Sequence, residues 1–153
     1  MLVSQATAAD VVDIARLLCL DTTGEAGEEL AVQEFAAELG RWWADRGDSH
    51  AAFIARDPGG EVVGMAWVAF VPRVPRPDSA RRMSADIQTV FVRSDHRSRG
   101  LGTALVQAAS EHAMRHDAIH VTVHSSRRAV PVYERSGFAS SPQLLQTEPP
   151  EPL

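Results

Sequence analysis

The stretch Arg97-Ser98-Arg99-Gly100-Leu101-Gly102 constrains this chain most, because it stands between an apolar strand pattern and an amphipathic helix pattern. Its glycines let the backbone approach a ligand without an intervening Cβ. The free N–H groups of the first helical turn favour an anion such as a pyrophosphate, and Arg97, Arg99 and Thr103 add donors. Arginine and glycine at a helix start can also act simply as a cap. The G-x-G-x-x-G fingerprint does not fit, and a P-loop is excluded because the chain contains no lysine.

The patterns along the rest of the chain predict a mixed α/β domain. A turn over 57–60 joins two of the expected strands into a hairpin, and prolines open an arginine-rich loop over 72–83. No repeat or linker divides the chain, so we expect one domain over 1–146 and a disordered tail over 147–153. The expected helices cover 7–20, 25–44, 100–116 and 129–136, and the expected strands cover 50–56, 61–71, 85–92, 119–123 and 138–145.

Composition narrows the class of protein. A chain of 153 residues with 44% hydrophobic residues suits one domain with one sizeable core. No apolar run is long enough to span a membrane, and the N-terminus lacks the pattern of a secretory signal. The single cysteine, Cys19, cannot form an internal disulfide, so we expect a cytoplasmic protein. The net charge of -5 argues against a nucleic-acid partner.

One pair of residues has a spacing found in metal sites. His112 and His116 are four apart in the expected helix over 100–116, as zinc ligands often are. No H-E-x-x-H context accompanies them. We therefore expect no metal.

Two segments together resemble a known family. Residues 97–102 resemble motif A of the GCN5-related N-acetyltransferase (GNAT) superfamily, Q/R-x-x-G-x-G/A. Residues 126–138, Ser-Arg-Arg-Ala-Val-Pro-Val-Tyr-Glu-Arg-Ser-Gly-Phe, are similar to its motif B, N-x-x-A-x-x-x-Y-x-x-x-G-F. The resemblance extends to about Leu145. It implies a three-layer α/β/α fold with a mostly antiparallel central sheet, and direct transfer from acetyl-CoA to a primary amine of a small molecule or peptide.

The resemblance also implies which residues bind acetyl-CoA. Val90 and Val92 would offer backbone groups to the pantetheine arm. Ser126 stands where the family often has asparagine, and its shorter side chain leaves that contact with the arm open. The residues that would cradle the pyrophosphate are Arg97, Ser98, Arg99, Gly100, Leu101 and Gly102, with Thr103 nearby.

For catalysis, the resemblance places Tyr133 near the thioester sulfur as general acid. Core packing beside Phe138 is the alternative. Asp86 falls where the histone-acetylating branch has a glutamate, and its shorter side chain calls for an intervening water if it is the base. Pairing of Asp86 with Arg81 or Arg82 is the alternative role. His120 and His124 on the next expected strand are lesser candidates for the base.

The acceptor is less constrained by the sequence. An acidic flank over 25–34 and the arginine-rich loop would face each other across the acceptor entrance, and Trp42 and Trp43 could line it. The acidic flank favours a cationic amine, and the arginine-rich loop favours an acceptor with a carboxylate. Both segments can also be charged surface that only water contacts. A non-catalytic acyl-CoA-binding regulatory module is an alternative function, and acetylation of a charged tRNA is another acceptor choice. The family is often dimeric, so a homodimer is also compatible.

Overall fold

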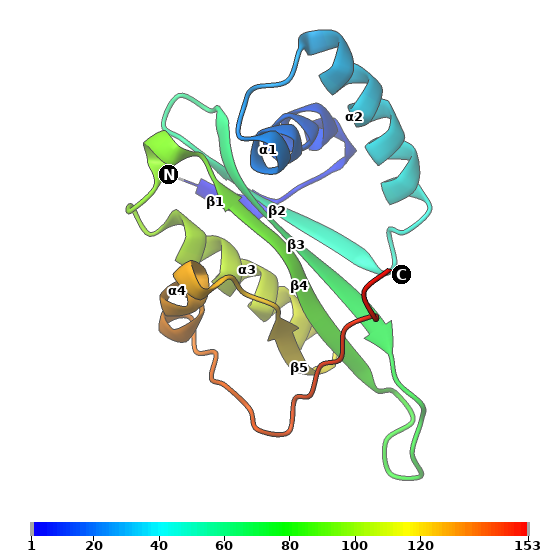
Figure 1. Cartoon of the computed structure of the whole chain (residues 1–153). Coiled ribbons are helices and arrows are strands. Elements are labelled where there is room, and N and C mark those ends of the chain that lie inside the picture. The colour runs from blue at the N-terminus through cyan, green and yellow to red at the C-terminus, as the bar shows by residue number, and fades with distance from the viewer. Residues whose placement is uncertain (1, 153) are drawn as a thin grey trace.

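The computed structural model describes residues 2–152, which form a five-stranded sheet between two helical layers (Figure 1). The sheet order is β1-β2-β3-β4-β5, with antiparallel pairing up to β4 and a parallel β4–β5 pair. The strands are β1 Leu2–Gln5, β2 His50–Arg56, β3 Val62–Pro72, β4 Met83–Val92 and β5 Ala118–Val123, and the helices are α1 Val11–Thr23, α2 Glu29–Ala44, α3 Leu101–Arg115 and α4 Val130–Arg135. The predicted fold class, a three-layer mixed α/β domain, is confirmed.

Two of the sequence predictions about strands are wrong. β1 was not predicted, because its four residues are too few to show an alternation; its pairing with β2 from Leu2↔Arg56 to Gln5↔Phe53 defines it. The strand expected over 138–145 does not form. Leu144 and Leu145 are 61% and 87% exposed, so pairing with the sheet would not be stabilised by burying them. In addition, Pro142 has no N–H to donate to a strand ladder.

The observed helix boundaries differ from the predicted ones by only a few residues. The second helix begins at Glu29 rather than at residue 25, because the segment after Gly24 first forms a loop. Gly24 ends α1 in the left-handed conformation with φ of 75°, which only glycine adopts readily. The first helical turn, Ala8–Asp10, is a 3-10 turn, and Asp10 accepts the Thr7 backbone N–H at 2.9 Å as in a capping box.

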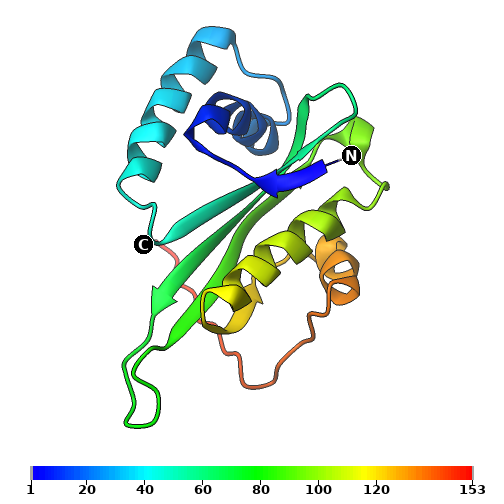
Figure 2. The same ribbon diagram turned by 180° about the vertical axis from the view of Figure 1, so that it is seen from behind.

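The two faces of the sheet carry separate cores. α1 and α2 cover one face, around Ile14, Ile54 and Met65, whereas α3 and α4 cover the other, around Val68 and Leu105 (Figure 2). Gly64 on β3 allows α3 to pack closely, since a Cβ there would lie 3.1 Å from the Leu105 side chain and 3.2 Å from the Phe91 carbonyl oxygen.

The arginine-rich loop and the acidic flank lie at opposite ends of β4, so the expectation that they face each other is wrong. The loop extends from the ends of β3 and β4 at Pro72 and Met83, whereas the α1–α2 connection lies near the other end of β4 (Figures 1 and 2). Within residues 2–152, no helix is long and apolar enough to cross a membrane, and no cluster of His, Cys, Asp or Glu could hold a metal ion.

Candidate functional site

The two motif segments meet in one cleft of about 440 Å³ at the outer edge of β4, here called the edge cleft. Arg99 and Asp86 do not line it, although both were predicted as site residues. The unexpected lining residues with charged or titratable side chains are Asp21, His96, Arg128 and Arg135. The predicted site residues that the fold brings together there are Val90, Val92, Arg97, Ser98, Gly100, Leu101, Gly102, Thr103, Ser126 and Tyr133.

The start of α3 presents free backbone donors to the edge cleft. Gly100 has φ of 79° and Ser98 has φ of 62°, so the loop turns sharply into the helix. The first bond of the helix runs from Ala104 N to the Gly100 carbonyl oxygen, and no side chain of the described residues 2–152 caps the helix start. The N–H groups of residues 101–103 therefore have no acceptor within the helix, and the helix dipole favours an anion beside them. This arrangement fits a pyrophosphate.

Arg97 is tied back onto the end of β4. Its Nε donates to the Val92 carbonyl oxygen at 2.9 Å, and its guanidinium carbon lies 5.8 Å from the centroid of the Phe91 ring. Across the cleft, burial raises the pKa of Asp21, partly opposed by the charge of Arg97. The remaining guanidinium N–H groups of Arg97 can donate to a bound anion.

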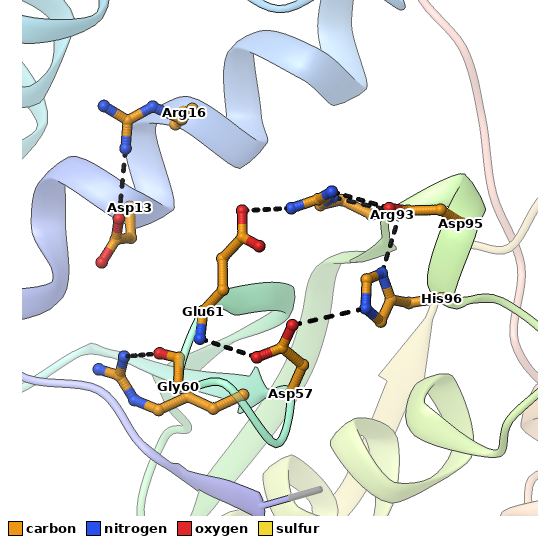
Figure 3. A network of polar contacts seen from close by, with 9 residues as sticks. Asp13, Arg16, Asp57, Gly60, Glu61, Arg93, Asp95 and His96 are labelled. Atoms are coloured by element: carbon orange, nitrogen blue, oxygen red, sulfur yellow. Dashed lines mark hydrogen bonds and ion pairs between the residues drawn. The ribbon is translucent and has the colours of Figure 1, made fainter.

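A polar network fixes the segment that precedes the glycine loop (Figure 3). Arg93 donates to Asp95 at 2.8 Å and bridges to Glu61, while His96 bonds Asp95 at 2.9 Å. These contacts link the β2–β3 turn to the 3-10 turn at Ser94–His96, from which the glycine loop begins. The hydrogen bonds from His96 and then Arg93 lower the pKa of Asp95 to about 2. The loop is thereby anchored before α3 starts.

β4 and β5 part beside this loop and leave a strand edge unpaired. Their register runs only from Met83↔Ala118 to Ile87↔Val123. Arg93 N donates to the Val63 carbonyl oxygen, so Arg93 and Val63 form a hydrogen-bonded pair. In an antiparallel ladder such pairs alternate with pairs that do not bond each other. Val92 and Val90 therefore belong to non-bonded pairs, and their N–H and C=O groups point away from β3, toward the side where β5 has separated. A register shift opposite Trp67 and Val68 leaves Gln88 as a bulge just before this edge. An extended ligand can pair there as a further strand, with the Val92 carbonyl already occupied by Arg97.

Tyr133 is 8% exposed and lines the edge cleft from α4. Its ring contacts Phe138 edge-on at 5.6 Å between centroids, so the packing suggested by the sequence exists alongside its place in the cleft. Burial raises the pKa of the Tyr133 phenol above its ordinary value of 10.0. The hydroxyl therefore keeps its proton at neutral and mildly alkaline pH.

Asp86 lies on the other face of β4, with its neighbours Ala85 and Ile87 in the core under α3. Its carboxylate accepts a hydrogen bond from Thr122 Oγ1 at 3.1 Å. Among the described residues it forms no ion pair with Arg81 or Arg82; Arg82 donates instead to the Val74 carbonyl oxygen. Asp86 thus faces the α1–α2 side of the sheet, two residues before the bulge at Gln88.

On that side lies a second cleft of about 310 Å³, here called the aromatic cleft. It touches β4 at Gln88 and Thr89, directly before the Val90 that lines the edge cleft. Trp42 lines it, as the sequence suggested, whereas Trp43 packs edge-on against Trp67 at 5.0 Å. The residues that enclose this cleft are Leu18, Phe35, Glu38, Leu39, Trp42, Trp67, Gln88 and Thr89.

Sequence reasoning missed Glu38, Gln88 and Thr89. Glu38 lies at i+3 from Phe35 and i−4 from Trp42, so the helical spacing could have placed it on their face. The bulge at Gln88 has no sequence signal, because an extra residue in one strand is visible only against its partner strand. A larger hollow of about 830 Å³ is lined by His50, His112, His116 and Trp43 and contains none of the predicted cofactor-binding or catalytic residues.

Comparison with known proteins places this chain in a family, which bears on the edge cleft described above. The family model described as acetyltransferase (GNAT) family matches residues 12–138. A glucosamine 6-phosphate N-acetyltransferase of Trypanosoma brucei brucei is 29% identical over 91 residues, which span 60% of this chain and 60% of that relative. The chain thus covers less than two thirds of the relative's length.

Solved structures share the fold. Glucosamine-6-phosphate N-acetyltransferase from Arabidopsis thaliana superposes with a TM-score of 0.73 at 17% identity, covering 96% of this chain and 97% of that one. A predicted acetyltransferase from Clostridium acetobutylicum, solved with acetyl-CoA, gives a TM-score of 0.69 at 17% identity, covering 96% and 95%. At these identities the likeness concerns the fold.

Proposed function

Because the chain belongs to the acetyltransferase (GNAT) family, we propose that it transfers the acetyl group of acetyl-CoA directly to a primary amine. The observation that carries this proposal is the convergence of both motifs on one cleft beside an unpaired strand edge. A non-catalytic acyl-CoA-binding module would need the same cleft. The buried, protonated phenol of Tyr133 within the cleft favours the enzyme.

The edge cleft suits acetyl-CoA in each part. The free N–H groups of residues 101–103, with Arg97 and Ser98, would hold the pyrophosphate. The outward-facing carbonyl oxygen of Val90 and N–H of Val92 would pair with the amide groups of the pantetheine arm. Acetyl-CoA supplies an acyl group activated as a thioester.

The residues around the parted strands would move two protons. Asp86, acting through a water, would take a proton from the bound ammonium group, whose ordinary pKa is about 10.4, so that the neutral amine can attack. The outward-facing N–H of Val90, next to the aromatic cleft, would polarise the thioester carbonyl as charge develops on its oxygen. As the new C–N bond forms and the C–S bond breaks, Tyr133 would donate its proton to the leaving thiolate. The nitrogen would release its second proton to solvent, which would return a proton to Tyr133.

The acceptor suggested by the relative's name is glucosamine 6-phosphate. The lining of the aromatic cleft gives it little support, since none of its residues is Arg, Lys or His. The wider proposal, a small-molecule or peptide amine, does not depend on that acceptor.

The test is release of free CoA thiol by purified protein supplied with acetyl-CoA and a panel of amines, with product masses raised by one acetyl group. Tyr133→Phe separates chemistry from binding, because it removes only the hydroxyl. Tight CoA binding by the wild type without turnover on any amine would contradict the enzymatic proposal and favour the binding module.

A further inference from the structure

We propose that the acceptor is a small primary amine with an aromatic or branched apolar body and no anionic group, bound in the aromatic cleft. This inference rests on the proposed acetyl transfer and specifies its substrate class. The cleft touches β4 at Thr89, and the edge cleft continues at Val90. An amine seated there lies next to the strand edge that would bind the thioester arm.

The walls of the cleft are apolar. Leu18 from α1 lies on one side, Phe35, Leu39 and Trp42 from α2 line another, and Trp67 on β3 forms the floor. The Trp67 Nε1 is buried and has no partner within residues 2–152, so Trp67 offers the cleft its ring rather than its N–H. Such walls gain free energy mainly by excluding water from an apolar ligand surface.

The aromatic wall is held in place before any ligand binds. The Trp42 ring meets Trp67 edge-on at 6.1 Å and His50 edge-on at 4.8 Å, and the Arg46 guanidinium lies 4.9 Å from its centroid. A wall fixed in this way loses little conformational entropy when a ligand binds. The volume of about 310 Å³ lies at the low end for small-molecule sites, which favours a compact ligand over a protein segment.

The polar side chains of the aromatic cleft favour a positively charged ligand. Among residues 2–152, Glu38 is the only charged residue that lines the cleft, and Gln88 and Thr89 provide uncharged polar groups at the β4 end. A carboxylate attracts an ammonium group and repels a carboxylate or phosphate on the ligand. Electron-rich ring faces also favour a cation. The cleft therefore matches a cationic amine head on an apolar body.

The experiment compares kcat/KM for four amines: 2-phenylethylamine, phenylalanine, ethanolamine and a phosphorylated amino sugar. We expect kcat/KM for 2-phenylethylamine to exceed that for phenylalanine by about tenfold, because the exposed Glu38 carboxylate repels the carboxylate of phenylalanine through partly screening solvent. Equal use of the two, or preference for the phosphorylated sugar, would overturn the inference while leaving acetyl transfer intact.

Variants on α2 identify the site. Glu38→Arg should reverse the preference toward phenylalanine, whereas the matched control Glu34→Arg, on the same helix but outside the cleft, should leave it unchanged. Trp42→Ala should weaken 2-phenylethylamine at least about tenfold, and Trp42→Phe should restore much of that loss. An unaltered preference in Glu38→Arg would contradict the assignment.

A binding readout keeps the inference testable without turnover. The three tryptophans of the chain, Trp42, Trp43 and Trp67, form one cluster at this cleft, so a bound amine should change the intrinsic fluorescence. Saturable quenching by 2-phenylethylamine that is lost in Trp42→Ala would support the cleft even if no amine were acetylated. Turnover of other amines without such quenching would reject it.

Discussion

The Asp86 carboxylate accepts a hydrogen bond from Thr122 Oγ1 at 3.1 Å, joining the two parallel strands just before they part. The contact fixes the carboxylate on the α1–α2 side of the sheet, two residues before the bulge that borders the aromatic cleft. Asp86 lines neither the edge cleft nor the aromatic cleft, so the base role that we propose for it requires a water between its carboxylate and the amine.

Asp86→Asn should lower kcat about 100-fold, since general-base catalysis contributes on this scale. The KM for acetyl-CoA should change little, because Asp86 does not line the edge cleft. Steady-state kinetics measure both constants. Thr122→Val, which removes only the hydrogen bond, should cost severalfold in kcat; an Asp86→Asn enzyme with unchanged kcat would exclude the base role.

Tyr133→Phe should reduce kcat by about 100-fold or more and leave CoA affinity nearly unchanged. Because burial raises the pKa of the phenol above 10.0, the wild-type enzyme should retain the proton donor up to that pH. The loss of kcat that reflects Tyr133 ionisation should thus appear only above about pH 10. A pH profile of kcat checks this; an alkaline limb due to Tyr133 well below pH 9 would contradict it.

Arg97→Ala should weaken CoA binding about tenfold, because the guanidinium lies in the edge cleft and charge-assisted hydrogen bonds are worth about 1.5–3 kcal/mol. Arg99→Ala is the matched control: this exposed arginine is two residues away and outside the cleft lining. Calorimetric titration with CoA should show less than about a twofold effect for it. Equal losses in the two variants would mean that general charge, rather than placement, matters.

Gly64→Ala should lower the free energy of unfolding by about 1–3 kcal/mol, as overpacking does in a dense core. The new Cβ would lie 3.2 Å from the Phe91 carbonyl oxygen, a backbone atom that cannot easily move. Gly47→Ala is the control, because no atom of the part of the chain that the structure describes lies within 4 Å of a Cβ there. Urea denaturation measures both. Equal stability of the two variants would show that α3 shifts to make room.

The sequence alone identified the elements with long or regular patterns and the segments with special chemistry. β2 has the predicted bounds, since apolar residues bounded by turn residues define a strand locally. Arg97 to Gly102 stood out as an anion site because glycines and arginines at a helix start are a local signal. Tyr133 was singled out only through the resemblance of residues 126–138 to the family's motif B. The strand expected over 138–145 failed because local apolarity cannot reveal whether a sheet edge will receive it.

Only the tertiary structure decided what those segments meet. It showed that β4 and β5 part after Ile87, that Gln88 is a bulge, and that Glu38 lies with Trp42 and Trp67 in one cleft. It also separated the acidic flank from the arginine-rich loop, at opposite ends of β4. Strand register and the packing of helices on a sheet depend on residues far apart in the chain, so no local pattern encodes them.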